Sequence, residues 1–527
     1  MSNVSNAKVV WKALEEALVF APDATAYVHR GEKISFREVN AASDRLATGL
    51  LNLGIKKGDR VAVIAPNRPE WLYTYFAAAK IGAICVGLSV RHGHGELLRL
   101  LELSQPSAII SVTGHQEMDY TVLLESWQKK RSSRVDLIFM DQPGPAGTLQ
   151  WEALLATQTD TGTLEAAKAG IEPDDEILLL FTSGTTGKPK GAALTNKSQL
   201  ASAYAEARHI RAHPEDVLLL TAPLFHVGGI TCGVLTMLLG KGSCVLFSDL
   251  EPKEVIRQAS AYRPTIFFGF PSTHTVLMMD PGFAELDRTS VRLVMTGGAS
   301  AGHTLLEKLK EAFPHSAIMN IYGLTETSGS VIMSSWNSPL DTLAKTVGKP
   351  LDDFKVKVAD QDGRPLARME TGEIFIKGNC VISGYYNMHE DSLHAFDQYG
   401  WLKTGDMAYV DEEGRIVLMG RRTEMYIQEG FNVYPVEVEE VLLSHPQISQ
   451  AAGIGIPDPV LGEVGRYYVV PNKGSHVTEK ELQKFCLQNL ADFKLPQQIV
   501  FRSDLPHTAT GKINKAKLRS DFEEEGK

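Results

Sequence analysis

Long apolar runs, paired cysteines and surplus positive charge are all scarce in this chain of 527 residues. No apolar run is long enough to span a membrane, and the first residues do not resemble a signal peptide. The five cysteines form no Cys-x-x-Cys pair, which favours reduced core residues in a cytoplasmic protein over a disulfide framework. The net charge of −10 argues against nucleic acid as a partner, so any phosphate ligand requires a local basic site.

The length predicts more than one domain, because a single hydrophobic core rarely holds 527 residues. Up to about residue 330, apolar strand-like runs alternate with helical segments, which predicts parallel sheets. Short strands and tight turns over residues 346–420 predict a small antiparallel barrel or sheet, and a compact α+β segment follows. We therefore predict an α/β fold with two parallel α/β sheets plus a small β-barrel in an N-terminal domain, residues 1–422. A smaller, mobile α+β C-terminal domain is predicted over residues 423–527.

Capping boxes and apolar periodicity predict individual elements. Ser35 and Glu38 form a Ser-x-x-Glu box that opens a helix, and Thr478 and Glu481 form a second one. Further helices are expected over Trp71–Lys80, from Gly95 and from about Val436. The expected strands are Arg60–Ile64, Ile84–Leu88, Val217–Leu220, Ser243–Phe247, Thr265–Phe268, Val291–Met295, Ala317–Ile321 and Tyr467–Val470.

The most informative segment is rich in glycine, hydroxyl groups and lysine and covers residues 181–191. Glycines let backbone N–H groups converge on one cavity, and lysines add positive charge, which is how proteins hold polyphosphate. The segment is not the P-loop of common NTPases, because only two residues separate Gly184 from Gly187 and Pro189 follows Lys188. A plain surface turn is the alternative, but the placement of the glycines and lysines favours phosphate binding.

Five further motifs follow in a fixed order, and with residues 181–191 they resemble the adenylate-forming superfamily of acyl-CoA synthetases, amino-acid adenylation domains and beetle luciferases. The resemblance covers nearly the whole chain. In that family a carboxylate attacks the α-phosphorus of ATP to give an acyl-adenylate and pyrophosphate, and a thiol, usually that of CoA, then expels AMP. The five motifs are Ala222–Gly229, Tyr322–Glu326, Thr404–Asp406, Gly420–Arg421 with Gly430–Pro435, and Pro506–Ile513.

The resemblance implies how the nucleotide is held. Glu326 is expected to bind Mg²⁺, because this ion commonly bridges one carboxylate to phosphate oxygens. Asp406 is expected at the ribose hydroxyls, where a turn-capping Asp is the simpler alternative. The residues expected to bind ATP or AMP are Thr182, Ser183, Gly184, Thr185, Thr186, Gly187, Lys188, Lys190, Gly298, Ala299, Ser300, Asn320, Ile321, Tyr322, Gly323, Thr325, Asp406 and Arg421, with Glu326 and Thr185 at the metal ion.

The resemblance also assigns catalysis and a domain movement. Lys512 is expected to bring the substrate carboxylate and the α-phosphate together, since an ordinary lysine is charged at neutral pH. Family members then rotate the C-terminal domain, so that Lys512 leaves and a face with Gly430 and Phe431 frames the CoA channel. The pivot is usually Asp or Lys, and Thr423 stands at that position here. The expected catalytic residues are Lys512, Thr325, Glu326 and His226.

The acyl pocket is expected after the strand that ends near Leu220, where His226 would flank both the acid and the thiol. A hydrogen-bonded core histidine is the alternative interpretation of His226. Amino-acid adenylation domains usually carry Phe-Asp where Phe225 and His226 stand here, which argues against an amino-acid substrate. The expected pocket residues are His226, Val227, Gly228, Phe270, Gly297, Gly323 and Leu324.

These features predict an ATP-dependent acid–CoA ligase that activates an apolar carboxylic acid, fatty or aryl, with ATP, Mg²⁺ and CoA. The alternatives are an acyl-AMP ligase that serves a carrier-protein thiol and a catalytically silent nucleotide-binding protein. Luciferase-like oxygenation is a remote third, and a kinase is disfavoured because no phosphate-acceptor base motif accompanies the loop. The choice among medium-chain, branched and aryl acids stays open, as does a homodimer.

Overall fold

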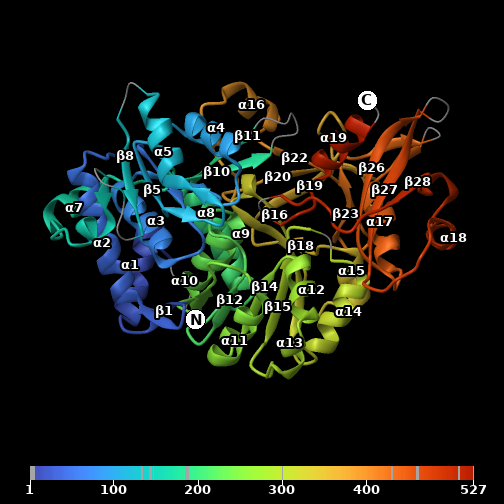
Figure 1. Cartoon of the computed structure of the whole chain (residues 1–527), viewed down its shortest axis with the longest axis horizontal. Helices are drawn as coiled ribbons and strands as arrows, with labels where there is room; N and C mark the ends of the chain where they lie inside the picture. The colour runs from blue at the N-terminus through green and yellow to red at the C-terminus, as the bar shows by residue number, and fades with distance from the viewer. Residues whose placement is uncertain are drawn as a thin grey trace.

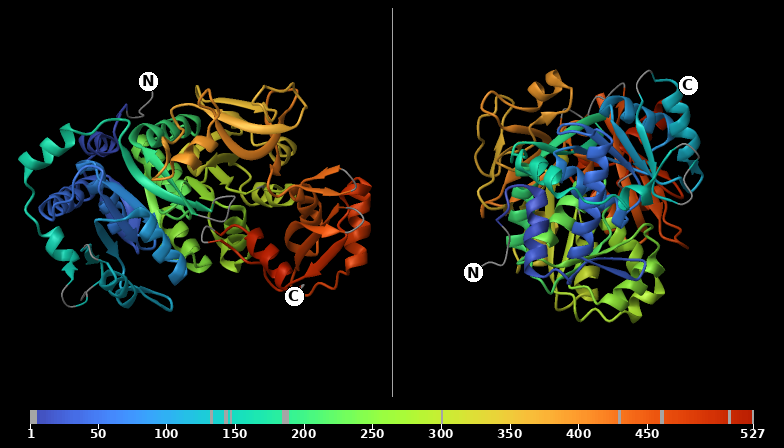
Figure 2. Two further views of the ribbon diagram at one scale, coloured as in Figure 1. Left: turned by 90° about the horizontal axis from the view of Figure 1, so that it is seen from above. Right: turned by 90° about the vertical axis from the view of Figure 1, so that its left-hand side faces the viewer.

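A computed structural model describes residues 6–131, 134–141, 145, 148–183, 189–299, 301–428, 431–458, 462–508 and 511–525. Two large sheets flanked by helices form most of the molecule, and the C-terminal segment lies at one end (Figures 1 and 2). Among the described residues, no helix is long and apolar enough to cross a membrane.

The first large sheet has eight strands in the order β21-β11-β10-β4-β3-β5-β8-β9. Strands β10, β4, β3, β5, β8 and β9 pair in parallel, whereas β11 and β21 extend the edge in antiparallel fashion. The strands are β3 (Arg60–Ile64), β4 (Ile84–Leu88), β5 (Ala108–Ser111), β8 (Asp136–Phe139), β9 (Leu149–Gln150), β10 (Glu176–Ser183), β11 (Pro189–Thr195) and β21 (Gly384–Tyr385).

The second large sheet has nine strands in the order β18-β17-β16-β15-β14-β12-β13-β1-β2. Its centre is parallel, and β17, β18 and β2 pair in antiparallel fashion. Nearly every central residue is buried, as expected for parallel strands covered on both faces. The strands are β1 (Thr25–His29), β2 (Glu32–Ser35), β12 (Val217–Leu220), β13 (Ser243–Leu246), β14 (Ile266–Gly269), β15 (Leu293–Gly297), β16 (Ala317–Leu324), β17 (Gly329–Met333) and β18 (Lys349–Pro350).

Two smaller sheets complete the fold. Residues 355–421 form an open antiparallel sheet in the order β19-β20-β22-β23, so this region is a sheet and not the small β-barrel of the predicted fold. The C-terminal sheet comprises β24 to β28. The strands are β19 (Lys355–Ala359), β20 (Gly372–Lys377), β22 (Leu402–Val410), β23 (Ile416–Arg421), β24 (Tyr426–Gln428), β25 (Phe431–Val433), β26 (Ile448–Asp458), β27 (Gly462–Pro471) and β28 (Gln498–Phe501), beside a separate hairpin of β6 (Gly114–His115) and β7 (Met118–Asp119).

Helices cover the faces of these sheets (Figure 1). They are α1 (Val10–Phe20), α2 (Phe36–Asn52), α3 (Pro69–Ile81), α4 (His94–Ser104), α5 (Tyr120–Lys129), α6 (Trp151–Leu155), α7 (Thr161–Ala169), α8 (Asn196–His209), α9 (Val227–Gly229), the π-helix η1 (Ile230–Leu235), α10 (Thr236–Gly240), α11 (Pro252–Tyr262), α12 (Pro271–Met279), α13 (Pro281–Glu285), α14 (His303–Ala312), the 3₁₀ turn η2 (Thr325–Thr327), α15 (Leu340–Lys345), α16 (His389–Ala395), α17 (Pro435–Ser444), α18 (Glu479–Asn489), the 3₁₀ turn η3 (Asp492–Lys494) and α19 (Lys515–Glu525).

The local predictions are confirmed where apolar runs end at turn residues. Strands β3, β4 and β12 have the predicted bounds, and the other predicted strands differ by one to several residues at their ends. The Ser35 backbone N–H donates to the Glu38 carboxylate at 2.8 Å and the Glu38 N–H donates to Ser35 Oγ at 3.2 Å, which completes the capping box of α2. The second capping box opens α18 in the same way.

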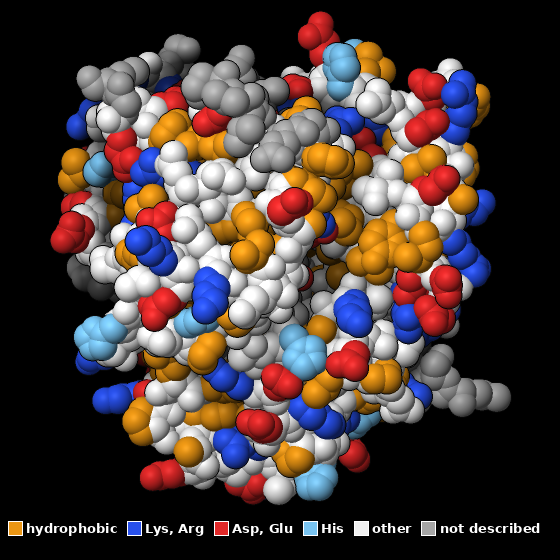
Figure 3. Space-filling view, turned by 90° about the vertical axis from the view of Figure 1, so that its right-hand side faces the viewer, with side chains coloured by type: hydrophobic (Ala, Val, Ile, Leu, Met, Phe, Trp, Pro, Cys, Tyr) orange, Lys and Arg blue, Asp and Glu red, His pale blue; other side chains and the backbone are white. Residues whose placement is uncertain are grey.

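The hydrophobic cores separate the two large sheets from the C-terminal segment. One large core joins both α/β sheets, and a second one covers the other face of the nine-stranded sheet. Two further cores lie entirely between residues 426 and 522, in the C-terminal segment. On the surface at that end, described side chains of both charge signs lie among apolar ones (Figure 3).

Candidate active site

The first part of the site is a buried carboxylate held by two partners. Asp406 lies on β22, opposite Arg421 on the neighbouring strand β23. The Tyr322 hydroxyl at the end of β16 donates to Asp406 Oδ2 at 2.8 Å, and Arg421 Nε lies 3.1 Å from Oδ1. Burial raises the pKa of Asp406, although the charge of Arg421 and the Tyr322 hydrogen bond act in the opposite direction. Three predicted nucleotide residues from separate segments therefore meet in one place.

Lys512 reaches this place from the C-terminal segment, next to an antiparallel bridge between His507 and Ile513. The Thr508 N–H donates to the Lys512 carbonyl at 2.7 Å, the Gly511 N–H donates to the Thr508 carbonyl, and Gly511 has a φ of +84°. Lys512 Cε lies 3.5 Å from the point where a Cβ on Gly298 would stand. Burial and then the Arg421 charge lower the pKa of Lys512, while the Asp406 carboxylate acts in the opposite direction. The ammonium group therefore lies between the two large segments of the chain.

An apolar and aromatic wall borders Lys512. The rings of His226 and Phe270 are 6.0 Å apart and meet edge to face. The Gly228 N–H donates to His226 Nδ1 at 3.0 Å, so the neutral ring carries its hydrogen on Nε2. Burial, and then the charge of Lys512, lower the pKa of His226 to about 3. His226 is therefore neutral at physiological pH, with an N–H available as a donor.

A second part of the site contains Glu326, which lies on the turn η2. The Tyr385 hydroxyl donates to Glu326 Oε1 at 2.8 Å, and Thr182 Oγ1 lies 3.5 Å from the same oxygen. Among the described residues there is no group of three His, Cys, Asp or Glu that could hold a metal ion. A single carboxylate suits Mg²⁺ whose other ligands are phosphate oxygens and water. Glu326 therefore fits the predicted ion, which would neutralise phosphate charge at this corner.

The glycines of the predicted pocket allow neighbouring backbone segments to pack closely. A Cβ on Gly323 would lie 2.0 Å from the Gly329 carbonyl oxygen, and one on Gly297 would lie 2.6 Å from the Ile321 carbonyl oxygen. On Gly298, whose φ is +78°, a Cβ would meet the Phe270 ring at 2.7 Å. These glycines let backbone segments approach each other; Gly298 and Ala299 are exposed, and Gly298 lies next to Lys512.

Several predicted residues lie beside this centre in less direct roles. Asn320 uses its amide to donate to the backbone carbonyls of Leu343 and Thr346, so it fixes a loop behind β16. Lys190 forms an ion pair with Asp391 on α16 at 2.7 Å. The remaining ones line the same strand ends and helix start: Ile321, Gly323, Leu324, Thr325, Val227, Gly228 and Gly297.

Other predictions fall on parts of the chain that the structure does not describe. The central phosphate-loop residues are among them, and for Ser183 only the backbone is described, as the end of β10. Gly184, Thr185, Thr186, Gly187, Lys188, Ser300 and Gly430 lie outside the described residues.

The predicted CoA residue Phe431 is exposed, and the predicted hinge Thr423 follows the strand that carries Arg421. Phe431 is 53% exposed and stacks on Phe493 with ring centres 4.4 Å apart. Thr423 follows β23, and its carbonyl accepts from Arg519 at 3.3 Å. Lys512 lies beside Gly298 while Phe431 faces solvent, so the two predicted working residues of the C-terminal segment are in different surroundings in this structure.

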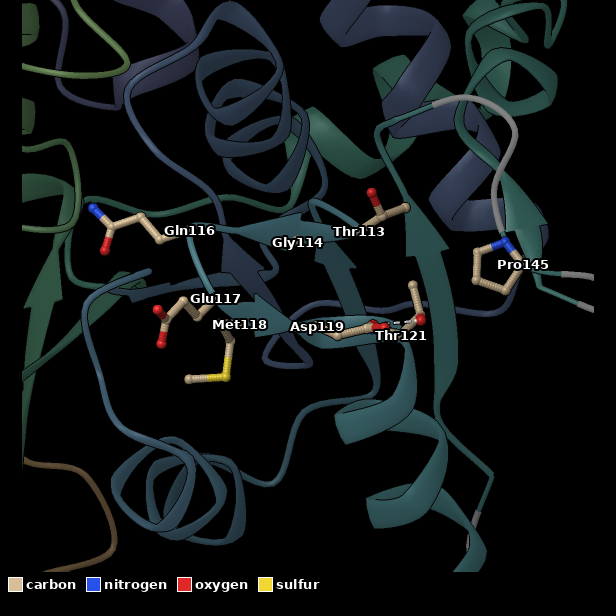
Figure 4. A pocket seen from close by; sticks show the side chains of 8 residues that line it. All are labelled: Thr113, Gly114, Gln116, Glu117, Met118, Asp119, Thr121 and Pro145. Carbon is tan, nitrogen blue, oxygen red and sulfur yellow. Dashed lines mark hydrogen bonds between the residues drawn. The ribbon is translucent and has the colours of Figure 1, made fainter.

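A separate open cavity of about 470 Å³ lies at the hairpin β6–β7 and the start of α5. Its lining is polar and includes Glu117 and Asp119, and Asp119 accepts from Thr121 at 2.6 Å (Figure 4). None of the predicted site residues lines it, and its carboxylates would repel a polyphosphate.

The fold and this site define an enzyme that forms adenylates. A family model described as AMP-binding enzyme matches residues 14–386, and one described as AMP-binding enzyme C-terminal domain matches residues 437–512. The chain therefore belongs to the AMP-binding enzymes of the adenylate-forming superfamily, in the branch of the ATP-, Mg²⁺- and CoA-dependent acid–CoA ligases.

Curated relatives and solved structures agree with this placement. The chain is 30% identical over 517 residues to the 3-[(3aS,4S,7aS)-7a-methyl-1,5-dioxo-octahydro-1H-inden-4-yl]propanoyl:CoA ligase of Mycobacterium tuberculosis, covering 98% of this chain and 99% of the relative. It is 32% identical to a feruloyl-CoA synthase of Amycolatopsis sp, covering 95% and 96%. The o-succinylbenzoate CoA synthetase of Bacillus subtilis, solved with its acyl-adenylate intermediate, has a TM-score of 0.82 and 28% identity, covering 96% and 97%.

Proposed function

We propose that this ligase activates an apolar, ring-bearing carboxylic acid and transfers its acyl group to CoA. The observation that carries the proposal is the position of the Lys512 ammonium, next to exposed Gly298 and facing the aromatic wall of His226 and Phe270. A carboxylate at this point would meet the lysine charge on one side and an apolar wall on the other.

In the first half-reaction, an oxygen of the substrate carboxylate attacks the α-phosphorus of ATP, and the bond from that phosphorus to pyrophosphate breaks. The two reactants are both anionic, so Lys512 stabilises their approach and the charge that develops in the transition state. Asp406 would accept the ribose hydroxyls and Arg421 would hold Asp406 in place, which fixes the α-phosphate relative to Lys512.

In the second half-reaction, the sulfur of CoA attacks the acyl carbon, the thiol proton is lost to solvent, and AMP leaves with the electron pair of the broken C–O bond. We propose that the domain has then rotated about Thr423, so that Lys512 has left and Phe431 frames the thiol channel. The neutral His226 side chain, with a hydrogen on Nε2, would donate to the acyl oxygen or ribose side of the adenylate during this step.

A ring-bearing acid agrees best with the pocket. His226 and Phe270 present edge-to-face rings, which pack well against a flat or fused-ring substrate. His226 leaves no carboxylate at the place where an amino-acid substrate would need a partner for its ammonium group. The relatives named above act on acids with feruloyl, succinylbenzoyl and hydrindane-dione groups, all of which contain rings.

The test is a panel of acids incubated with the protein, ATP, Mg²⁺ and CoA, with AMP and acyl-CoA quantified by chromatography. We expect AMP release with aryl or fused-ring acids, a weaker response with medium-chain fatty acids and none with amino acids. Replacing CoA by a phosphopantetheinylated carrier protein separates the ligase from a carrier-dependent enzyme. Release of ADP in place of AMP would overturn the proposal, and a preference for linear fatty acids would overturn the substrate class.

A further inference from the structure

A tyrosine that belongs to none of the six motifs contacts the expected metal-binding carboxylate. Tyr385 ends β21, which pairs with β11, the strand that returns from the phosphate loop, in the register Ala192 to Tyr385. The Tyr386 N–H donates to the Gly191 carbonyl at 2.7 Å, which extends this attachment. The segment around Tyr385 is therefore anchored to the phosphate-binding segment almost 200 residues earlier in the chain.

The same segment also fixes Glu326. The Ile382 N–H donates to the Glu326 backbone carbonyl at 3.0 Å, and the Tyr385 hydroxyl donates to Glu326 Oε1 at 2.8 Å. An ordinary tyrosine keeps its proton at neutral pH and a carboxylate can only accept, so the phenol is the donor in this hydrogen bond. Both side-chain contacts that Glu326 makes within the described ranges fall on Oε1, since Thr182 also approaches that oxygen at 3.5 Å.

The phenol is itself held by a lysine and a carboxylate. Lys190 Nζ lies 5.3 Å from the centre of the Tyr385 ring, a cation–π distance, and forms an ion pair with Asp391 at 2.7 Å. The Tyr385 N–H donates to Ser392 Oγ at 2.8 Å, which ties the backbone to the same helix α16. Lys190 was expected to contact phosphate directly; in this structure its charge is engaged by Asp391 and by the ring.

We propose that Tyr385 is a positioning residue for the Mg²⁺ ligand Glu326. By occupying Oε1, the phenol leaves Oε2 as the oxygen for the ion and fixes the carboxylate in one orientation, and Lys190 with Asp391 keeps the phenol in place. Outer contacts of this kind commonly tune metal affinity, because they orient the ligand before the ion arrives. The inference depends on the proposed role of Glu326, so its test includes a variant of that residue.

The variant Tyr385→Phe removes only the hydroxyl, so the ring and its contact with Lys190 stay. Mn²⁺ binding to the complex of the protein with α,β-methylene-ATP is measured by electron paramagnetic resonance. The Mg²⁺ dependence of ATP–pyrophosphate exchange is measured in parallel. We expect both midpoints to rise about tenfold, as for the loss of one hydrogen bond to a charged group. Thioester formation from preformed acyl-AMP should keep its rate, because that step needs no pyrophosphate.

The neighbouring residue provides a matched control. Tyr386 has no side-chain hydrogen bond within the described part of the chain, so Tyr386→Phe should leave both midpoints at the parent values. Asp391→Asn, which weakens the hold on Lys190, should raise the midpoints by a smaller factor of about two to three. Thermal unfolding of each variant shows that it is folded, and Asp391→Asn keeps the inference testable if Tyr385→Phe does not fold.

The Glu326→Gln variant separates the proposed metal-binding role of Glu326 from the positioning role of Tyr385. If Glu326→Gln leaves Mn²⁺ binding at the parent value, then Glu326 is not the ligand and the proposed metal role fails. If Glu326→Gln weakens Mn²⁺ binding while Tyr385→Phe does not, the metal role stands and the positioning role of Tyr385 is refuted. A loss in Tyr385→Phe that appears equally in Tyr386→Phe would also refute it.

Discussion

At the scale of single residues, we propose that adenylate formation depends on the positive charge of Lys512. Replacing it in the Lys512→Ala variant should slow ATP–pyrophosphate exchange by about 10²–10³, the usual cost of one electrostatic contact to a transition state. The pKa of Lys512 is lowered, so the parent rate should decline with rising pH below the point expected for an ordinary lysine. This decline should be absent from the residual rate of the variant.

The control for this prediction uses the second half-reaction. Acyl-CoA formation from synthetic acyl-AMP should proceed at the parent rate in Lys512→Ala, since in the proposed mechanism the lysine has moved away from the adenylate at that stage. Equal exchange rates in parent and variant would contradict the role given to Lys512.

Some of these residues could be predicted from sequence and others could not. Tyr322, Asp406, Arg421 and Lys512 belong to motifs whose order along the chain indicates a shared site, and the structure brings them together. Tyr385 has no such signal, because its contact with Glu326 depends on the pairing of β21 with β11, which only the folded sheet supplies.

At the scale of elements, the strand pair β16–β17 depends on a glycine without a special backbone angle. Gly323→Ala would place a Cβ 2.0 Å from the Gly329 carbonyl oxygen, so the strands must separate. We expect a loss of about 2 kcal/mol or more in the free energy of unfolding, as for overpacking elsewhere. Gly95→Ala is the control, because nothing lies within 4 Å of its Cβ position and alanine favours its helix. Denaturant unfolding measures both, and equal stabilities would contradict the packing argument.

Helix α8 contains a carboxyl group whose burial makes the stability of the protein depend on pH. Glu206 is fully buried, accepts from Ser330 Oγ at 2.6 Å, and burial raises its pKa from 4.5 to about 7. The folded state thus binds a proton that the unfolded state releases, so stability falls as pH rises from about 4.5 through 7. Glu206→Gln, a neutral analogue, should stabilise the protein at pH 8 by up to about 3 kcal/mol and by almost nothing near pH 4.

Thermal unfolding at both pH values checks this prediction. If the ionisation of Glu206 is the cause, the stability gained in Glu206→Gln must shrink as the pH falls. A gain that is the same at both pH values would show that the glutamine stabilises the protein by packing instead.

Secondary structure was predictable where apolar runs are bounded by turn residues, as in β3 and β12, because burial alone specifies such strands. Strand β26 had no comparable signal, since Gly453 and Gly455 interrupt it. A Cβ on Gly453 would lie 2.2 Å from the Tyr467 ring, and one on Gly455 would lie 2.3 Å from the Tyr426 Cβ. The glycines are therefore part of a packed aromatic core that sequence periodicity cannot show.

At the scale of the whole molecule, the separate cores predict two unfolding events. The clusters between residues 426 and 522 share no member with the larger cores. We expect calorimetry to show two transitions, and residues 423–527 expressed alone to reproduce the smaller one. A non-hydrolysable acyl-adenylate analogue, which would contact Lys512 and the N-terminal residues together, should bring the transitions closer. A single transition without ligand would contradict independent cores.

Phe431 faces solvent while Lys512 lies beside Gly298, and this difference has a consequence for the proposed order of the two half-reactions. In the proposed mechanism the C-terminal segment presents either Lys512 or Phe431 to the adenylate, so the thiol of CoA would reach the acyl carbon only after pyrophosphate has formed, and the mixed anhydride would stay covered until CoA replaces the lysine. On this proposal the acyl-adenylate would be shielded from hydrolysis by the position of the C-terminal segment, and the rate of domain rotation would set how long that shielding lasts.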